Sequence, residues 1–304
     1  MHTKLALALL LPLLAGAADA PTQNSSRAPR LPVGVRAFRD LEYITNGHAR
    51  QKLDVFLPAT GANWPLIVWI HGGAWLEGSK ESPPALRFLR EGYAVASVNY
   101  RLSQHAIFPA QIQDCKAAIR WLRANANQFG YDASHIGVWG SSAGGHLVAL
   151  LGTSGGVKDF AAVGANTNVS DRVQCVVDFF GPTDLTAMAK QAPADSAIEH
   201  DAPGSPESKL LGGPVQQRKE LARTANPITY VSPDDPPFLI LHGDKDNLVP
   251  IGQSELLQAA LKTVGVDSTF FVVKGAGHGF RNRPDLDPMV GEFFAKHLKG
   301  SATK

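Results

Sequence analysis

The five residues Gly140-Ser141-Ser142-Ala143-Gly144 constrain the fold of this chain more than any other feature of its sequence. An apolar run, Ile136 to Trp139, precedes them, and a segment that favours a helix, His146 to Leu151, follows them. Ser142 is therefore expected at a strand-to-helix turn that is too tight for side chains at the flanking positions, which are glycines. Such a turn holds a serine hydroxyl out at the carboxyl end of a sheet, so the motif predicts a nucleophilic serine.

A serine hydroxyl is a weak nucleophile at neutral pH, and it needs a base that is itself oriented by a carboxylate. Two later segments supply candidates: Asp246 ends His242-Gly243-Asp244-Lys245-Asp246, and His278 lies in Gly275-Ala276-Gly277-His278-Gly279. The chain order serine, aspartate, histidine is that of the α/β-hydrolase fold and differs from the chymotrypsin and subtilisin orders. We therefore predict Ser142 as the nucleophile, His278 as the base and Asp246 as the acid.

Nine other histidines compete with His278 for the role of the base. His71 and His242 are expected in loops at the same edge of the sheet, but His71 precedes Ser142 in the chain and His242 comes shortly before the acid. His278 follows an expected strand in a glycine-rich loop, from which its ring can reach back over the sheet.

Three aspartates are candidates for the acid. Asp246 is favoured because it follows the seventh expected strand and precedes Asn247-Leu248-Val249-Pro250. Asp244 is two residues away and is expected to cap the turn. Asp184 follows the sixth expected strand, where some proteins of this fold place the acid, and its alternative role is to bond the backbone at the start of the next segment.

The segment His71-Gly72-Gly73-Ala74-Trp75 lies upstream of the serine. Attack on an ester carbonyl puts negative charge on oxygen, which must be stabilised by preorganised N–H donors. We expect one donor from the backbone of Ala143 at the start of a helix, where the helix dipole assists. Gly73 and Ala74 are expected to supply the others, and Trp75 to offer a flat surface to a ring of the substrate. A plain glycine turn is the alternative interpretation of this segment.

The strand pattern changes character along the chain. Val35 to Tyr43 and Lys52 to Leu57 predict two strands joined across Asn46-Gly47. Nearly continuous apolar runs then predict strands that are covered on both faces of a parallel sheet. These runs are Leu66 to Ile70, Ala94 to Val98, Ile136 to Trp139, Val173 to Phe180 and Phe238 to Leu241, and Thr269 to Lys274 is a further expected strand.

Apolar residues at spacings of three and four predict amphipathic helices between the strands. They are Ile112, Cys115, Ile119, Leu122 and Ala126 in one segment and Leu257, Ala260, Leu261 and Val264 in another. The pattern predicts an α/β fold with a mostly parallel sheet, an N-terminal antiparallel hairpin and helices on both faces. The stretch Gly181 to Thr224 fits neither period, and we expect it to form a cap after the sixth strand.

The first residues have the composition of a targeting signal. Lys4 precedes an apolar block, Leu5 to Leu14, and small residues continue to Ala20. This pattern predicts a signal peptide over residues 1–20 that is cleaved, and hence a secreted or periplasmic protein that is not held in a membrane. Residues 21–32 are expected to be a disordered leader, and residues 33–300 to form the hydrolase domain.

The composition of the chain argues against several other functional classes of protein. A chain of 304 residues that is 44% hydrophobic fits one large α/β domain. The net charge is only +2, without a basic run interleaved with aromatic residues, so nucleic acid is not expected as a partner. We find no phosphate-binding loop or dinucleotide fingerprint and expect no cofactor.

Two further patterns have structural interpretations. His242-x-Asp244-x-Asp246 contains metal-ligating residue types, but nothing else in the chain supports a metal site, and none is predicted. Cys115 and Cys175 each lie inside an apolar pattern, which favours two buried free thiols over a disulfide.

Several motifs between Gln51 and Phe280 belong together. They are Gln51-Lys52-Leu53-Asp54-Val55, His71-Gly72-Gly73-Ala74-Trp75, Asn99-Tyr100-Arg101-Leu102, Phe108-Pro109-Ala110-Gln111, Asp114 to Leu122, Ser141 to His146, Phe180-Gly181-Pro182-Thr183-Asp184, and the Asp246 and His278 loops. By these motifs the chain resembles the bacterial feruloyl esterase and acetyl xylan esterase group, which is similar to the hormone-sensitive-lipase-like carboxylesterases. Ala74 and Ser141 stand where the latter usually have glycine and an acidic residue, and this favours the feruloyl and acetyl xylan side.

The resemblance implies a serine esterase for short-chain or aromatic acyl esters, with acetyl or feruloyl groups on plant polysaccharide as the expected substrates. An amidase or formamidase of the same fold is the alternative enzyme, and a catalytically silent binding module is the alternative from another class. A true lipase is less favoured, because the expected cap is polar and lacks a long apolar face.

Overall fold

The computed structural model describes residues 31–280 and 283–300. The predicted signal peptide, and all but the last two residues of the predicted leader, lie outside the described residues. No helix within the described ranges has both the length and the apolar character required to cross a membrane.

Eight strands form one sheet in the order β1-β2-β4-β3-β5-β6-β7-β8. The strands are β1 (Arg36–Glu42), β2 (Lys52–Leu57), β3 (Trp64–Ile70), β4 (Ala94–Val98), β5 (Tyr131–Ser141), β6 (Cys175–Phe179), β7 (Phe238–Gly243) and β8 (Ser268–Val273). The strand β2 pairs antiparallel with both β1 and β4, and every pairing from β4 to β8 is parallel. The predicted N-terminal hairpin and parallel sheet are confirmed.

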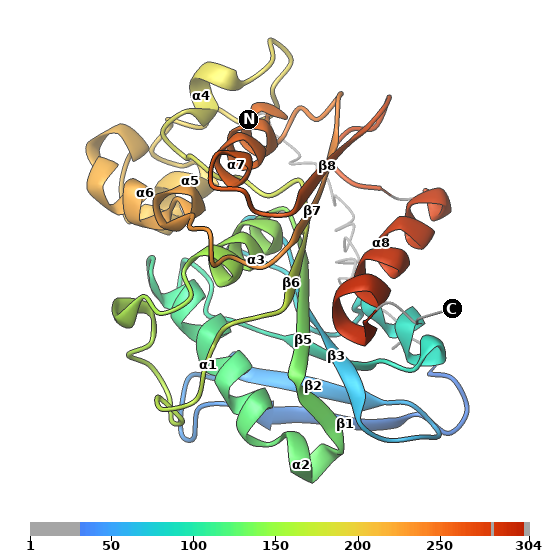
Figure 1. The fold of residues 1–304 in the computed structure, drawn as a ribbon. Helices are drawn as coiled ribbons and strands as arrows, with labels where there is room; N and C mark the ends of the chain where they lie inside the picture. The colour runs from blue at the N-terminus through green and yellow to red at the C-terminus, as the bar shows by residue number, and fades with distance from the viewer. Residues whose placement is uncertain (1–30, 281–282, 301–304) are drawn as a thin grey trace, which may run out of the picture.

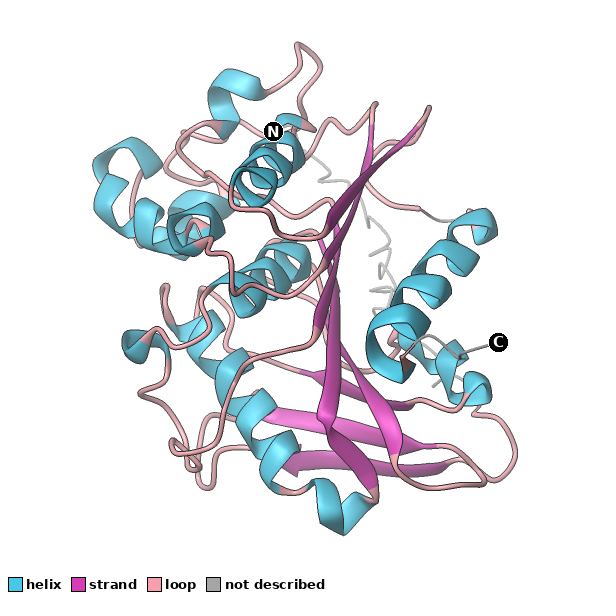
Figure 2. Cartoon of the chain, in the orientation of Figure 1, coloured by secondary structure: helices cyan, strands magenta, loops and turns pink. Residues whose placement is uncertain are grey.

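Helices cover both faces of this twisted sheet (Figures 1 and 2). One face carries α1 (Ala110–Ala124), α3 (Ala143–Thr153) and α7 (Gly252–Thr263), and the opposite face carries α8 (Asp287–Phe294). The shorter elements are η1 (Pro84–Glu91), α2 (Ala126–Phe129), η2 (Lys158–Phe160), α4 (Met188–Gln191), α5 (Pro206–Leu211), η3 (Val215–Gln217), α6 (Lys219–Ala225), η4 (Pro227–Tyr230), η5 (Pro284–Leu286) and η6 (Ala295–Lys299).

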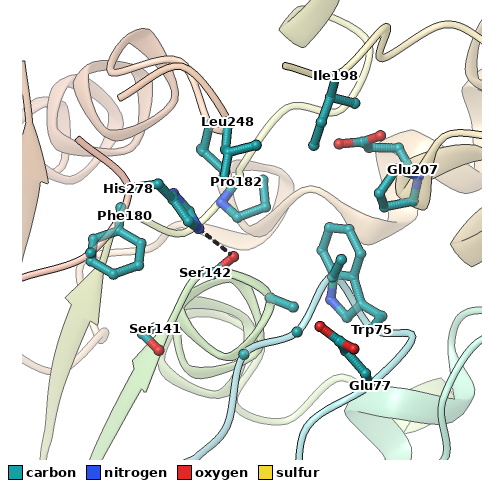
Figure 3. A pocket seen from close by; sticks show the side chains of 17 residues that line it. Trp75, Glu77, Ser141, Ser142, Phe180, Pro182, Ile198, Glu207, Leu248 and His278 are labelled. Carbon is teal, nitrogen blue, oxygen red and sulfur yellow. Dashed lines mark hydrogen bonds between the residues drawn. The ribbon is translucent and has the colours of Figure 1, made fainter. Parts of the chain in front are cut away.

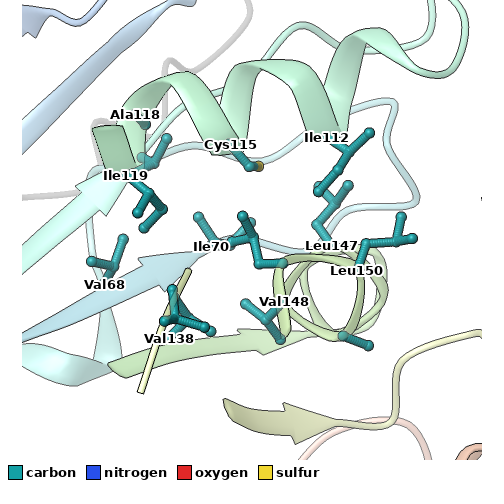
Figure 4. Packing of buried hydrophobic residues seen from close by; sticks show 14 of the residues in the cluster. Val68, Ile70, Ile112, Cys115, Ala118, Ile119, Val138, Leu147, Val148 and Leu150 are labelled. Carbon is teal, nitrogen blue, oxygen red and sulfur yellow. The ribbon is translucent and has the colours of Figure 1, made fainter. Parts of the chain in front are cut away.

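The central strands are buried on both faces, as their continuous apolar runs predicted. Val68 and Ile70 of β3 join the cluster under α1 and α3 (Figure 4), whereas Ile67 and Trp69 of the same strand join the cluster under α8. Alternate side chains of a strand point to opposite faces, so each run supplies both cores. The sheet is thereby held rigidly between two helical layers.

The two cysteines belong to different faces of the sheet. Cys115 lies on α1 in the first cluster, and Cys175 lies on β6 in the second. Both are buried and free, which confirms the expectation of unpaired thiols.

One strand begins earlier than its apolar run indicated. The strand β5 begins at Tyr131 because Tyr131 and Asp132 pair with Trp64 and Pro65 of β3 before a register shift. Residues 132–135 are polar or small and partly exposed, so apolar continuity could not reveal this extension. The pairing is a long-range contact that extends β5 beyond its buried part.

Residues 181–224, where a cap was expected, contain the short helices α4, α5 and η3 and most of α6. The helices α4, α5 and α6 lie together beside α7 (Figure 1). Two backbone hydrogen bonds tie this segment to the body of the domain: Phe108 N donates to Leu210 O over 2.9 Å, and Ala197 N donates to Asn247 O over 2.9 Å. Leu210 and Leu211 of α5 are fully buried. The segment is therefore packed onto the domain by its apolar side chains.

Candidate active site

Ser142 lies in the sharp connection between β5 and α3. Its backbone has φ 55° and ψ −123°, a sparsely populated conformation for a residue with a side chain. The turn is held by Ser142 N, which donates to Phe179 O over 2.8 Å. A Cβ on Gly140 would lie 2.2 Å from the carbonyl oxygen of Gly144, so the two ends of the turn approach too closely for a side chain. The five-residue motif thus forms the strained turn that its sequence predicted.

The structure brings the three predicted residues Ser142, His278 and Asp246 into one hydrogen-bonded chain. The Nδ1 atom of His278 lies 2.8 Å from Asp246 Oδ2, and its Nε2 atom lies 3.0 Å from the Ser142 hydroxyl (Figure 3). A carboxylate can only accept, so Nδ1 carries the proton and Nε2 is left to accept from the serine. This tautomer suits a base that takes the serine proton.

Asp246 is buried and accepts hydrogen bonds on both carboxylate oxygens. The backbone N–H groups of Leu248 and Val249 each donate to Oδ1 over 2.9 Å, while His278 and His242 lie 2.8 and 3.2 Å from Oδ2. Burial opposes ionisation, but the hydrogen bonds from His242 and His278 outweigh it and hold the pKa of Asp246 well below its usual range. The carboxylate is therefore ionised and oriented at neutral pH.

His242 also belongs to this network, although the sequence did not predict that role. Its Nε2 atom donates to Val249 O over 2.9 Å and faces Asp246, and its Nδ1 atom accepts from the Ser254 hydroxyl over 2.7 Å. The ring is fully buried on β7. Its position four residues before Asp246 was visible in the sequence, but its direction depends on how the loop after β7 folds back.

The two alternative aspartates do not contact His278. Asp244 accepts from Gly275 N over 2.6 Å and lies 3.5 Å from the ammonium of Lys274. Asp184 accepts from both the backbone N–H and the hydroxyl of Thr186, over 2.9 and 2.7 Å. Each therefore stabilises a turn, the role expected of it if it was not the acid.

The loop after β3, His71 to Trp75, passes directly beside the turn that carries Ser142. We refer to these two segments as the oxyanion loop and the serine turn (Gly140 to Gly144). A Cβ on Gly72 would lie 2.6 Å from the carbonyl oxygen of Ser141 and 3.3 Å from the Cβ of Ser142, so this approach requires glycine. Gly73 and Ala74 follow with φ of 103° and 55°. An alanine at positive φ is uncommon, and its presence here marks a sharply bent backbone.

Three backbone N–H groups at this junction are those expected to stabilise an oxyanion. Gly73, Ala74 and Ala143 all line the cavity in front of Ser142. Within the described part of the chain, none of their N–H groups donates to a backbone carbonyl outside regular helix and strand bonding. Ala143 is the first residue of α3, where an N–H has no intrahelical partner. The structure thus places the expected donors together.

His71 fixes the position of the same loop through its own contacts. It is buried, stacks on Tyr100 at 4.4 Å between ring centroids, and lies 2.7 Å from Gly72 O through Nδ1 and 3.1 Å from the Arg50 guanidinium through Nε2. The carbonyl accepts from Nδ1, so Nε2 accepts from Arg50 and the ring is neutral. Burial, assisted by the charge of Arg50, lowers the pKa of His71 to about 4. His71 therefore orients the loop and does not contact the nucleophile's base.

A cavity of about 440 Å³ opens in front of the serine. Figure 3 shows apolar side chains (Phe180, Pro182 and Leu248) on the side of His278, and Trp75, Glu77 and Glu207 on the other side. Its lining comes from the oxyanion loop, the serine turn, the cap segment and the loops after β7 and β8: Gly72, Gly73, Ala74, Trp75, Glu77, Ser141, Ser142, Ala143, Phe180, Pro182, Ile198, Pro206, Glu207, Leu248, Val249, His278 and Gly279.

Trp75 contributes less open surface to this cavity than its sequence position indicated. Its side chain belongs to the main core and is 2% exposed, with its ring set edge-on to His146 at 5.2 Å between centroids. The residue lines the cavity, but little of the indole is open to a ligand. Its role in substrate binding stays a prediction.

The residues His242, Asp244 and Asp246 do not form a metal centre in this arrangement. His242 and Asp246 bond each other, while Asp244 bonds a different loop. Among residues 31–280 and 283–300, no group of three or more histidine, cysteine, aspartate or glutamate side chains is arranged to hold a metal ion.

Comparison with known proteins places this site in a family. The family model described as BD-FAE matches residues 53–261, which is more than half of the chain. The chain belongs to the BD-FAE family. This match includes the serine turn, the oxyanion loop and Asp246, and it ends before His278.

Two curated relatives of this BD-FAE protein are esterases of Mycobacterium tuberculosis. Esterase LipC is 32% identical over 71% of this chain and 53% of its own length, and Esterase LipQ is 33% identical over 73% and 52%. The chain therefore spans about half the length of the curated relatives it matches.

Two solved structures that share the fold are named for carbohydrate substrates. A truncated form of a carbohydrate esterase from gut microbiota is 34% identical with a TM-score of 0.78, covering 87% of this chain and 96% of its own. An acetyl ester-xyloside bifunctional hydrolase from Caldicellulosiruptor lactoaceticus is 27% identical with a TM-score of 0.67, covering 82% and 88%. The α/β-hydrolase fold predicted from the sequence is confirmed.

Proposed function

We propose that this BD-FAE protein is a serine carboxylesterase that hydrolyses short-chain or aromatic acyl esters, with acetyl or feruloyl groups on plant polysaccharide as its substrates. The observation that carries the proposal is the chain of hydrogen bonds from Ser142 through His278 to Asp246, set beside free N–H donors in an open cavity. The names of the carbohydrate esterase and the acetyl ester-xyloside hydrolase support the class of substrate.

The geometry accounts for both halves of the reaction. The Nε2 atom of His278 takes the Ser142 proton as the oxygen attacks the ester carbonyl, and Asp246 stabilises the resulting imidazolium. The N–H groups of Gly73, Ala74 and Ala143 receive the charge on the carbonyl oxygen. His278 then gives its proton to the leaving alcohol, which leaves an acyl group on Ser142.

Deacylation repeats these steps with water as the nucleophile. His278 takes a proton from water, the hydroxide oxygen attacks the acyl carbonyl, and the proton returns to Ser142 as the acid leaves. No residue beyond the same three and the same N–H donors is required. One site therefore completes the cycle.

The cap favours small or polar substrates over lipid. Among the described residues, the large apolar side chains that are exposed are Val33, Phe38 and Ile107, and none of these lies between Gly181 and Thr224. A lipid-docking face needs several hundred Å² of contiguous apolar surface. The cap directs its leucines inward instead, which supports an esterase and not a lipase.

The experiment compares wild-type protein with Ser142→Ala on 4-nitrophenyl acetate, methyl ferulate and acetylated xylan. We expect turnover of all three by the wild type, and loss of kcat by about a million-fold in the variant without loss of the circular dichroism signal. Variant turnover above about one per cent of wild type would remove Ser142 from the mechanism. Matched ester and anilide substrates distinguish an esterase from an amidase, and absence of both activities would identify a silent binding module.

A chain-length series tests the acyl preference. From the cavity of about 440 Å³ and the polar cap, we expect kcat/KM to decline beyond acyl chains of roughly six to eight carbons, without a rate increase on emulsified substrate. Peak activity on emulsified long-chain esters would make the protein a lipase. Export to the periplasm or medium, proposed from residues 1–20, is checked by the N-terminal sequence of the mature protein.

A further inference from the structure

The cavity in front of Ser142 contains a buried carboxylate that the esterase mechanism does not use. Glu207, in the first turn of α5, lines the cavity and is 3% exposed. Its Oε1 atom lies 3.0 Å from His200 Nδ1, and its Oε2 atom is buried without a hydrogen-bond partner among the described residues. Figure 3 shows this carboxylate between Ile198 and Trp75, pointing into the cavity from the side opposite His278.

The position of Glu207 is fixed by its neighbours. His200 is 1% exposed and bonds Oε1, so the carboxylate cannot rotate freely. Ser205 stabilises the segment between His200 and Glu207. Its hydroxyl donates to His200 O over 2.8 Å and accepts from Ser208 N over 3.1 Å. A preorganised acceptor of this kind discriminates between ligands because it loses little freedom on binding.

A buried acceptor without a donor is unfavourable and uncommon in folded proteins. Phe180, Pro182 and Leu248 lie across the cavity and carry no donor, and no donor among the described residues pairs with Oε2. The Nε1 atom of Trp75, beside Glu207, is likewise buried without a partner. A hydroxyl of the ester would supply Oε2 with a donor, and an ester without a hydroxyl would leave the carboxylate unsatisfied. Glu77, the other carboxylate of the cavity, is exposed and is satisfied by solvent.

We propose that Glu207, oriented by His200, is a specificity-determining residue that accepts a hydrogen bond from a hydroxyl group of the ester substrate. The inference rests on the proposed esterase function and adds to it the feature by which substrates are selected. The hydroxyl has two possible sources, the phenol of a hydroxycinnamoyl group or a sugar ring. The experiment has one arm for each source.

The test uses the full chain, with kcat/KM ratios in two substrate pairs. The acyl arm compares methyl 4-hydroxycinnamate with methyl 4-methoxycinnamate, and the alcohol arm compares a mono-acetylated methyl xyloside with cyclohexyl acetate. Glu207→Gln is the decisive variant: its amide oxygen can accept from His200, so its NH₂ faces the cavity as a donor. Glu77→Gln is the matched control, because it neutralises an exposed carboxylate of the same cavity.

We expect the wild type to prefer the hydroxylated ester by roughly tenfold or more in one arm, which identifies the half of the substrate that carries the hydroxyl. Glu207→Gln should reduce that ratio by roughly tenfold, and Glu77→Gln should leave it within about twofold. An unchanged ratio in both arms for Glu207→Gln overturns the inference. An equal reduction by Glu77→Gln also overturns it, since the preference would then reflect the overall negative potential of the cavity.

Glu207 is buried, so thermal unfolding is measured for its variant. If Glu207→Gln does not fold, the wild-type ratios decide: preference for a hydroxylated ester supports the inference, and ratios near one in both arms overturn it. The underlying function is tested separately with 4-nitrophenyl acetate. Turnover of this ester that depends on Ser142, together with ratios near one, overturns the role of Glu207 alone, whereas absence of any turnover that depends on Ser142 overturns the proposed esterase.

Discussion

Replacing Gly72 by alanine tests the placement of the oxyanion loop. Gly72 does not have a positive φ, so alanine suits its backbone and the whole effect comes from the added methyl group. That Cβ would lie 2.6 Å from Ser141 O, whereas ordinary contacts begin at 3.4 Å. The loop and the serine turn must therefore separate by about 0.8 Å, the difference between these two distances, unless the backbone relaxes elsewhere.

This separation is large on the scale of catalytic geometry. A misplacement of about 1 Å costs roughly a hundredfold in rate, and loss of one oxyanion donor costs about a hundred- to a thousandfold. We therefore expect Gly72→Ala to lower kcat by roughly a hundredfold, or about 2.7 kcal/mol of transition-state stabilisation, with little change in KM. Overpacking should also reduce the free energy of unfolding by about 1–3 kcal/mol.

The assay is kcat and KM on 4-nitrophenyl acetate together with thermal unfolding. Gly204→Ala is the control, because a Cβ there meets no atom within 4 Å and Gly204 has no positive φ. It should retain wild-type kcat. If Gly72→Ala keeps kcat within about threefold of wild type, the loop tolerates the methyl group and its close approach is not required for catalysis.

Three further changes probe the acid, its supporting histidine and the response to pH. Asp246→Asn should lower kcat by roughly four orders of magnitude by presenting His278 in the wrong tautomer, whereas Asp244→Asn should cost far less because Asp244 bonds the Gly275 backbone. His242→Phe removes one donor from Asp246, so the pKa of Asp246 should rise and kcat should fall on the order of tenfold at constant KM. Burial lowers the pKa of both His71 and His146 from the ordinary value of 6.5 to about 4. Between these values the unfolded chain binds more protons than the folded protein, so the free energy of unfolding should fall as the pH falls from 6.5 to 4, by on the order of 3 kcal/mol for each histidine.

The measurements are steady-state kinetics for the first two changes and urea unfolding at several pH values for the third. A larger loss of kcat in Asp244→Asn than in Asp246→Asn would mean that the acid is wrongly assigned. Wild-type kcat in a folded His242→Phe variant would show that the other donors suffice to hold Asp246.

The pH response has opposing contributions from two aspartates, because burial also raises the pKa of Asp235. Burial raises the pKa of Asp178 from 3.8 to about 6, and this group therefore adds stability as the pH falls through that window. Asp178 and Asp235 together offset part of the loss from the two histidines. A free energy of unfolding that does not decline between pH 6.5 and pH 4 would contradict the assignment of both histidines as neutral and buried.

The sequence alone determined the order of the reactive residues and the kind of sheet that carries them. The glycines around Ser142 specify a tight turn whatever surrounds it, because the restriction is local and steric. Apolar runs such as Leu66 to Ile70 specify strands covered on both faces for a similar reason. The apolar character of each residue indicates that its own side chain is buried. Chain order then separated His278 from nine other histidines.

Tertiary structure decided which groups act on one another across the cavity. The sequence indicated the correct edge of the sheet for His242, but the expectation of a loop was wrong, because His242 belongs to β7. Its bond to Asp246 exists because the chain after β7 turns back on itself. Nothing in the polar composition of the cap distinguished Glu207 from its acidic neighbours. It lies in the cavity because α5 packs its leucines against the domain and thereby turns one carboxylate inward. Such contacts depend on distances between segments far apart in the chain, which residue patterns within one segment do not encode.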